Sequence, residues 1–165
     1  MITSEKELEN YIIDDEGFCK FIGDAFSLKH VNVIENQVHV GNENIIDVLC
    51  AGLDDEEKEV LVVVELKFRP IEAKDFAQLG RYISALIRIW NVEFPCKIKG
   101  LLVGTGISNE CGQILNGQLL NDDTKVAVIK SQLQYYDATC SWWNGCVSVS
   151  GQIASCLSDF TKEKR

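Results

Sequence analysis

The chain has 165 residues, which is the size of one domain with a hydrophobic core of its own. Apolar residues make up 46% and charged residues 25%, as in soluble globular proteins, and no apolar run approaches the about 18 residues of a membrane-spanning helix. The net charge of −9 argues against a broad nucleic-acid-binding surface, because phosphate contacts need Lys and Arg. The polar N-terminus lacks the apolar stretch of a signal peptide and predicts a cytoplasmic protein.

The seven cysteines do not predict a disulfide framework or a zinc site. Their number is odd, and no two of them are spaced as Cys-x-x-Cys. Disulfides are also rare in a reducing cytoplasm. Cys50 lies in an apolar run and is expected to be a buried thiol, whereas Cys140 and Cys146 flank a predicted turn.

A first helix is predicted to begin at Ser4, which forms a capping-box pattern with Glu7. An apolar stripe follows at Leu8, Tyr11 and Ile12. Glu5 lies one turn before Leu8 and is expected on the same side as this stripe, although the helix dipole alone also favours acidic residues in a first turn. Glu9 is the second acidic candidate on this helix.

Three strands are predicted next. β-Branched residues in loose alternation indicate a strand over 30–40, and a second strand, 45–51, follows a Gly-Asn turn. The charged loop 53–59 leads into a third strand, 59–67, which is expected to pair antiparallel with the second. Because its apolar run is continuous, the third strand is predicted to lie centrally in the sheet, with both faces buried.

The second half of the chain continues the alternation of helices and strands. A broad apolar face predicts a helix over 72–90, which connects the third strand to a parallel strand at 97–105. A helix at 108–120 and a strand at 124–130 follow. Asn144-Gly145 predicts a hairpin turn.

These elements predict one domain of the α/β class, with a mixed central sheet flanked by helices. The domain is expected to span residues 1–165, with its core over about 4–130 and a C-terminal hairpin and tail over 131–165.

Polar residues interrupt two of the apolar strands. Glu65 and Lys67 share one face near the end of the third strand, and Asp47 is a lone carboxylate in the second strand. Two carboxylates on neighbouring strands repel each other unless a cation lies between them, and Mg²⁺ prefers oxygen ligands. Taken alone, Glu65 and Lys67 also fit a surface ion pair, and Asp47 also fits a carboxylate bound by backbone amides.

The following helix adds two polar side chains. Gln78 and Tyr82 are four residues apart and lie together at the flank of the apolar face. The turn through Arg69 and Pro70 is expected to bring this flank back over the carboxylates. Gln78 is then placed to hold a water molecule, and Tyr82 a phosphate oxygen.

Three segments together resemble a known family: "IIDVLCAG", "VVVELKFR" and "DFAQLGRYISAL". They look like the PD-(D/E)XK nuclease superfamily and, more narrowly, the nuclease domain of the NucS/EndoMS type. The resemblance covers about residues 4–104 and implies a restriction-endonuclease-like core. A lone D…ExK pattern is weak, but the ordered set with its spacing is more specific.

The resemblance implies a role for each matching residue. The catalytic set would be Asp47, Glu65, Lys67, Gln78, Glu5 and Tyr82. Mg²⁺ or Mn²⁺ would be bound by Asp47, Glu65 and the backbone carbonyl of Leu66. Beside this set, Arg69, Lys74 and Arg81 are the candidates for nucleic-acid contacts, although Lys74 and Arg81 also fit solvated side chains.

Two functions therefore remain open at the level of sequence. The first is a magnesium-dependent deoxyribonuclease that hydrolyses phosphodiester bonds in DNA. The second is a catalytically silent nuclease fold that binds another protein, for example in DNA repair or phage defence, because an acidic surface suits a basic partner. A homodimer that builds a basic cleft is a third expectation. Residues 60–102 carry a net charge of +3, so basic charge concentrates around the candidate site.

Overall fold

The computed structural model describes residues 2–41, 43–89, 97–109, 124–130 and 134–137. The helices and strands follow one another as α1 (Glu5–Ile12), α2 (Glu16–Phe26), β1 (Lys29–His39), β2 (Ile45–Leu53), β3 (Glu59–Leu66), β4 (Pro70–Ile71), α3 (Ala73–Ile89), β5 (Lys97–Gly104), β6 (Gly106–Ile107), β7 (Thr124–Lys130) and β8 (Gln134–Asp137).

The main sheet has six strands in the order β1-β2-β3-β5-β7-β8. β3 pairs antiparallel with β2 and parallel with β5, and β7 continues the parallel part. The predicted α/β class, the mixed sheet and the central position of β3 are therefore confirmed. From Val60 to Leu66 every residue of β3 is buried, as its continuous apolar run predicted.

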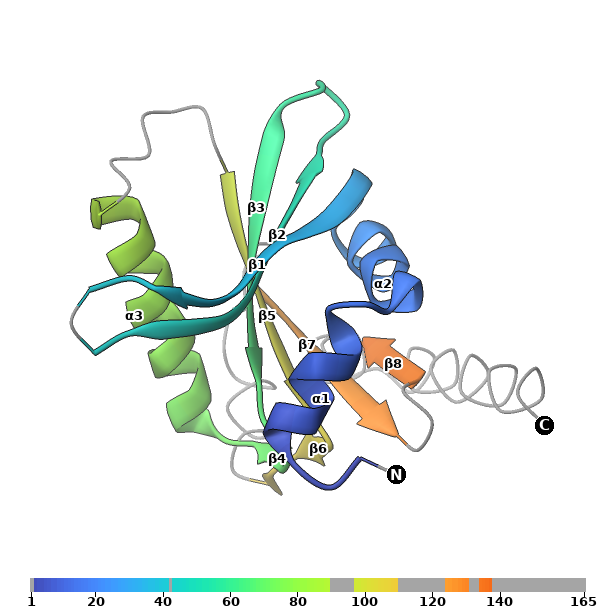
Figure 1. The fold of residues 1–165 in the computed structure, drawn as a ribbon, viewed down its shortest axis with the longest axis vertical. Coiled ribbons are helices and arrows are strands. Elements are labelled where there is room, and N and C mark those ends of the chain that lie inside the picture. Colours follow the sequence, from blue (N-terminus) through green and yellow to red (C-terminus); the bar gives the residue numbers. More distant parts are fainter. Residues whose placement is uncertain (1, 42, 90–96, 110–123, 131–133, 138–165) are drawn as a thin grey trace.

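Helices cover both faces of this sheet (Figure 1). α1 and α2 pack on one face, where their apolar side chains meet alternate residues of β2 and β3, such as Val48 and Val62. α3 packs on the other face, where Leu79 and Leu86 contact the opposite set, such as Leu61 and Val63. Because successive side chains of a strand point to opposite faces, the sheet has a hydrophobic core on each face, and β3 contributes residues to both.

Three parts of the fold were not predicted. β8 is a short strand that pairs antiparallel with β7 at the end of the main sheet. α2 is a separate helix that begins after its N-cap, Asp15, and ends at Ser27 in the left-handed conformation. β4 and β6 form a second, two-stranded parallel sheet beyond the ends of β3 and β5. The expected helix over 108–120 and the hairpin at Asn144-Gly145 fall almost entirely outside the described residues, as do Cys140 and Cys146.

The chain leaves β3 along a fixed path. The backbone N–H of Lys67 donates to the carbonyl of Val103 at 2.8 Å, and that of Thr105 donates to the carbonyl of Arg69 at 3.1 Å. A Cβ atom on Gly104 would lie 2.8 Å from the same Arg69 carbonyl oxygen, so only glycine allows this approach without a shift. The segment that follows Glu65 is therefore held firmly against the end of β5.

Candidate functional site

The candidate site lies where β2 and β3 separate. Their ladder pairs Val48 with Val64, and the same register brings Asp47 opposite Glu65. Beyond this pair, a side chain takes the place of the backbone ladder: Oδ2 of Asp47 accepts a hydrogen bond from the backbone N–H of Leu66 at 2.8 Å. The N–H and C=O groups of a strand residue point to the same side, so the Leu66 carbonyl also faces β2. Asp47 and Glu65 are thus neighbours at the end of a rigid strand.

Glu65 is the most perturbed carboxyl group of the site. Only 3% of its surface is exposed, and its buried Oε2 atom has no hydrogen-bond partner among the residues that the structure describes. Burial, followed by the adjacent Asp47 carboxylate, raises the pKa of Glu65 to about 10. Without a cation, this pair of carboxylates therefore holds a proton at neutral pH.

Glu5 and Lys67 lie beside this pair. Burial and the charge of Asp47 raise the pKa of Glu5, while the ammonium group of Lys67 opposes this rise. The interaction joins the first turn of α1 to the end of β3 across the sheet edge. Of the two acidic candidates on α1, Glu5 is the one that faces Asp47 and Lys67.

Gln78 and Tyr82 form a pair on α3, as their spacing predicted. The Nε2 atom of Gln78 donates to the Tyr82 hydroxyl at 2.8 Å. Burial and the negative charge of Glu65 raise the pKa of Tyr82, so the phenol faces the carboxylates and stays protonated. Since its oxygen already accepts a hydrogen bond from Gln78, its own proton is free to be donated.

The sequence missed Gln37 beside the site and named Glu9 only as the second acidic candidate on α1. Glu9 is 3% exposed and accepts hydrogen bonds from the side-chain amides of Asn36 and Gln37, at 2.9 and 2.8 Å. Gln37 also faces Asp47, with 3.4 Å between Nε2 and Oδ1. No periodic signal marks this network, because it depends on a backbone irregularity at Gln37 in β1.

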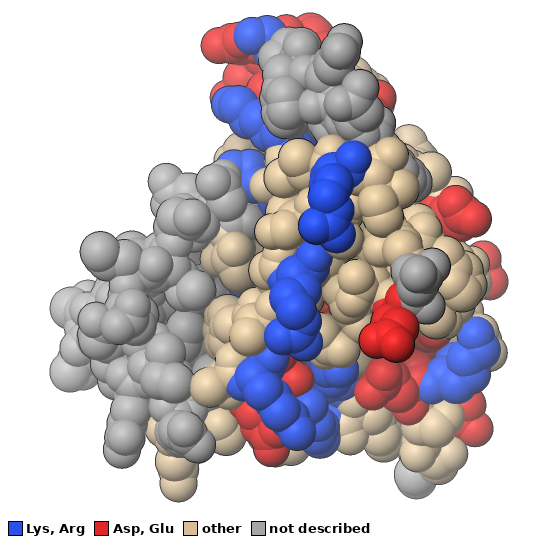
Figure 2. All heavy atoms as spheres, turned by 90° about the vertical axis from the view of Figure 1, so that its left-hand side faces the viewer, with Lys and Arg blue, Asp and Glu red and all other residues tan. Residues whose placement is uncertain are grey.

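The three basic residues assigned to nucleic acid differ in their surroundings. Arg69 forms two 2.8 Å hydrogen bonds with the buried carboxylate of Asp75, and Lys74 pairs with Glu72 at 3.2 Å. Arg81 is exposed on α3 and forms no ion pair with any residue that the structure describes. Figure 2 shows a band of Lys and Arg side chains along the face that α3 presents, with acidic side chains mainly at its margins.

The geometry fits a divalent cation with oxygen ligands. Asp47 and Glu65 are adjacent carboxylates, the buried Oε2 of Glu65 lacks a partner, and the Leu66 carbonyl faces the same side. Within the described ranges, no group of three or more His, Cys, Asp or Glu side chains is arranged to hold a metal. The predicted set is compatible with that finding, because only two of its three ligands are side chains. The metal and the role of each ligand remain predictions.

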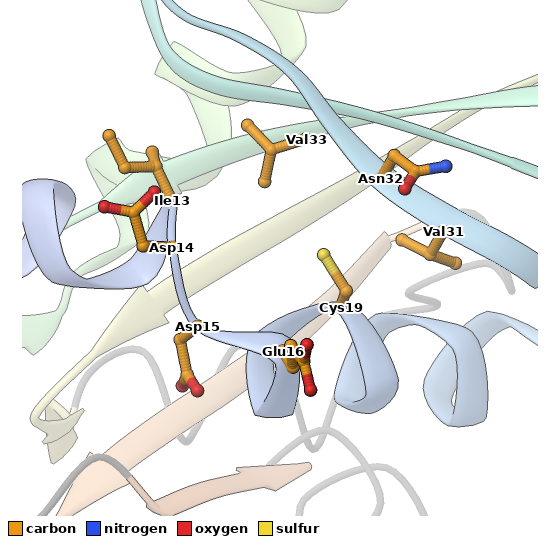
Figure 3. Close-up of a pocket in the computed structure, with 8 residues that line it drawn as sticks. All are labelled: Ile13, Asp14, Asp15, Glu16, Cys19, Val31, Asn32 and Val33. Atoms are coloured by element: carbon orange, nitrogen blue, oxygen red, sulfur yellow. The ribbon is translucent and has the colours of Figure 1, made fainter.

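A pocket between the α1–α2 turn and β1 contains none of the predicted site residues (Figure 3). Asp15, one of its acidic residues, caps α2 through the Gly17 backbone N–H and accepts the Tyr135 hydroxyl at 2.7 Å. Cys19 is half-buried there, and burial raises the pKa of its thiol, so it carries little of the reactive thiolate at neutral pH. The contacts of Asp15 therefore serve the fold, and Cys19 does not have the features of a reactive thiol.

Comparisons with solved structures give partial matches at low sequence identity. A crystal structure of a repair endonuclease from Pyrococcus abyssi is 21% identical with a TM-score of 0.49, and the match covers 79% of this chain and 48% of that one. An EndoMS complex with double-stranded DNA is 22% identical with a TM-score of 0.46, covering 71% of this chain and 42% of that one. The chain thus spans about half the length of these proteins. No curated protein matches it.

The comparison with family models is more informative. Residues 4–125, which include every predicted site residue, match the model of the endonuclease NucS C-terminal domain. In the described residues, no helix is long and apolar enough to cross a membrane. The match covers about three quarters of the sequence, and the chain therefore belongs to the endonuclease NucS C-terminal domain family.

Proposed function

We propose that this domain is a metal-dependent endonuclease of the PD-(D/E)XK type that hydrolyses phosphodiester bonds in DNA. The observation that carries the proposal is the Asp47–Glu65 pair, with a buried oxygen that lacks a partner, at the end of a central strand and beside Lys67. Such a pair is costly unless a cation or a proton compensates it. Membership of the NucS family supports DNA as the substrate class.

Asp47, Glu65 and the Leu66 carbonyl would hold Mg²⁺ or Mn²⁺, which when bound supplies a Lewis acid for the phosphoryl oxygens. Lys67 orients the attacking water and offsets negative charge that develops on the phosphate. Glu5 is placed to accept the proton of that water, because its raised pKa brings it closer to the working pH of a general base. The water oxygen bonds to phosphorus as the bond to the leaving oxygen breaks, and the leaving oxygen takes up a proton from solvent water.

The Gln78–Tyr82 pair serves positioning in this proposal. Gln78 fixes the phenol through its 2.8 Å hydrogen bond, and the Tyr82 hydroxyl, which stays protonated, donates a hydrogen bond to a phosphate oxygen. Both side chains project from α3, whose packing against β3 and β5 holds them in place. A substrate phosphate would thus meet donors on one side and carboxylates on the other.

The outer face of α3 is the surface best suited to the DNA backbone. Residues 76–89 contain no acidic side chain, and Lys74, Arg81 and Arg88 recur every seven residues along it (Figure 2). The distance from the first to the last is about 21 Å along the helix, or about six base pairs of duplex. Beside this row lies a groove of about 570 Å³, lined by Asn44, Ala77, Gly80, Arg81, Ser84, Ala85 and Arg88. Small side chains leave the arginines accessible.

A cleavage assay with Mg²⁺ or Mn²⁺ on single-stranded, duplex and mismatched DNA tests this function. Activity is expected to need the metal and to fall by at least about 100-fold in Asp47→Asn and Lys67→Ala. Lys58→Ala, in the exposed β2–β3 turn at the other end of β3, should keep parental activity. Metal-independent cleavage, or full activity in Asp47→Asn, would refute the mechanism. Absence of both cleavage and Mn²⁺ binding by the parent would favour a protein-binding module.

A further inference from the structure

Gln37 has a backbone conformation that its side chain does not favour. Its φ is 51°, in the left-handed region, although it lies within β1. Long side chains rarely adopt this conformation, and residues that do so are found preferentially at functional sites. The register pairs Asn36 with Val48 and Val38 with Ile46, which brings Gln37 opposite Asp47. The irregularity therefore occurs beside the candidate metal site.

The amide of Gln37 joins two carboxylates. Its Nε2 atom lies 2.8 Å from Oε2 of Glu9 and 3.4 Å from Oδ1 of Asp47. Only the NH₂ group can face two acceptors, so this contact also fixes which way the amide points. Together with the Leu66 N–H on Oδ2, both oxygens of Asp47 meet a donor. The free lone pairs of the carboxylate are thereby left in a defined direction.

Glu9 anchors this amide from α1. It is 3% exposed, and its other oxygen accepts the side-chain amide of Asn36 at 2.9 Å and pairs with Lys6 at 3.6 Å. Among the described residues Glu9 forms hydrogen bonds with Asn36 and Gln37 but not with Asp47, so its influence on the site passes through Gln37. Asn36 shares the anchor but does not reach Asp47, which makes it the natural control.

We propose that Gln37 is a positioning residue of the metal site, which orients the Asp47 carboxylate and is itself held by Glu9. The inference rests on the proposed function, because it assumes that Asp47 binds the metal. Groups that orient metal ligands in this way typically contribute about 10–100-fold in metal affinity. A need for the Gln37 amide beside Asp47 would explain why this residue of β1 has a positive φ.

The test compares Mn²⁺ binding by calorimetry and thermal unfolding in the parent, Gln37→Gly and Asn36→Ala. Gln37→Gly should bind Mn²⁺ about 10–100-fold more weakly. It also removes one buried hydrogen bond of Glu9, but glycine adopts positive φ freely, so its unfolding temperature should fall no further than that of Asn36→Ala. Asn36→Ala should unfold at a lower temperature, because it removes one of the buried hydrogen bonds of Glu9, yet keep its Mn²⁺ affinity within about twofold.

The outcomes separate this inference from the proposed function. If the parent binds Mn²⁺ and cleaves DNA but Gln37→Gly binds the ion equally tightly, the positioning role is wrong and the nuclease proposal stands. Equal loss of affinity in Asn36→Ala would assign the effect to the Glu9 network as a whole and would also overturn the role of Gln37. A parent that binds no Mn²⁺ overturns both proposals.

Discussion

At the scale of single residues, the site places two carboxylates side by side, so that without a metal ion the pair takes up a proton from solvent at neutral pH. Asp47 obtains donors from Leu66 and Gln37, but Oε2 of Glu65 obtains none. Lys67 is close enough to lower the pKa of Glu65, but burial outweighs it. The arrangement is therefore less stable without a ligand than an apolar core of the same shape would be.

Glu65→Gln is expected to stabilise the metal-free protein. The folded-state pKa of Glu65, about 10, lies above its ordinary value, so the folded state binds more protons than the unfolded state and the parent loses stability as pH rises from about 5 to 10. The glutamine removes this dependence and should raise the free energy of unfolding by about 1–2 kcal/mol at pH 8. Urea unfolding in EDTA at pH 6 and pH 8 measures the difference, which should be larger at pH 8.

Glu59→Gln is the matched control, because Glu59 is exposed at the other end of β3. It should change the stability by less than about 0.5 kcal/mol. With saturating Mg²⁺ the parent should become more stable than Glu65→Gln, since that variant lacks one of the proposed ligands and gains less binding energy from the ion. A destabilised Glu65→Gln in EDTA would mean that the carboxylate has a partner within the fold.

The sequence predicted some residues of the site better than others, for physical reasons. Asp47, Glu65 and Lys67 stand out because strands alternate strictly, and a charge in an apolar strand is conspicuous. Gln37 gave no such signal, and Glu9 stood out only as a second acidic residue on the first helix. The contact between them depends on a left-handed residue within β1, which no local pattern of residue types encodes.

At the scale of elements, one ion pair fixes the turn between β3 and α3. The guanidinium of Arg69 binds both oxygens of Asp75, and the same carboxylate accepts the backbone N–H of Glu72 at 2.8 Å, in the first turn of the helix. The Asp75 side chain is 2% exposed, whereas that of Arg69 is 35% exposed. This pair ties the end of β3, which carries Glu65 and Lys67, to the helix that carries Gln78 and Tyr82.

Asp75→Asn should destabilise the protein in a pH-dependent manner. Burial alone would raise the pKa of Asp75, but Arg69 and the Glu72 N–H outweigh it and hold the pKa below its ordinary value of 3.8. The stabilisation is therefore complete at neutral pH and is lost as pH falls below about 4. We expect a loss of about 2 kcal/mol at pH 7 that shrinks toward pH 3, measured by urea unfolding at both values.

Glu72→Gln serves as the control, since Glu72 is 45% exposed and lies 3.5 Å from Arg69. Its effect should stay below about 0.5 kcal/mol at either pH. A loss in Asp75→Asn that is the same at pH 3 and pH 7 would show that the charge of Asp75 does not contribute, and that the packing of its side chain does.

The elements themselves were predictable where their periodicity was long and pure. β2, β3, β5, β7 and α3 emerged within one or two residues of their bounds, because burial on both faces or on one broad face leaves an unambiguous pattern. α2 was missed because it contains Gly17 and Gly23 and follows a run of acidic residues that resembles a loop. Gly23 is needed there, since a Cβ atom would lie 2.9 Å from the Leu28 carbonyl oxygen.

At the scale of the whole molecule, the net charge of −9 conflicts with DNA as a partner unless the charge is distributed unevenly. α3 provides such an uneven distribution. Its outer face carries Lys74, Arg81 and Arg88 without an acidic side chain between residues 76 and 89, although Lys74 pairs with Glu72 at the end of the row. The acidic remainder of the surface would then repel DNA and restrict binding to this one side.

The double variant Arg81→Ala/Arg88→Ala should weaken duplex binding in EDTA and make it less sensitive to salt. Each lost phosphate contact lowers the magnitude of the slope of log K against log salt concentration by about 1, so a change of about 2 is expected. Lys20→Ala/Lys29→Ala removes the same charge from exposed positions on α2 and at the start of β1, and should leave the slope within about 0.5 of the parent. Fluorescence anisotropy at several salt concentrations measures both.

Equal changes in the two double variants would mean that DNA responds only to the total charge, and α3 would then lose its assigned role. A change confined to the α3 variant would instead place the DNA backbone on the helix that also carries Gln78 and Tyr82, which links substrate binding directly to the geometry of the site.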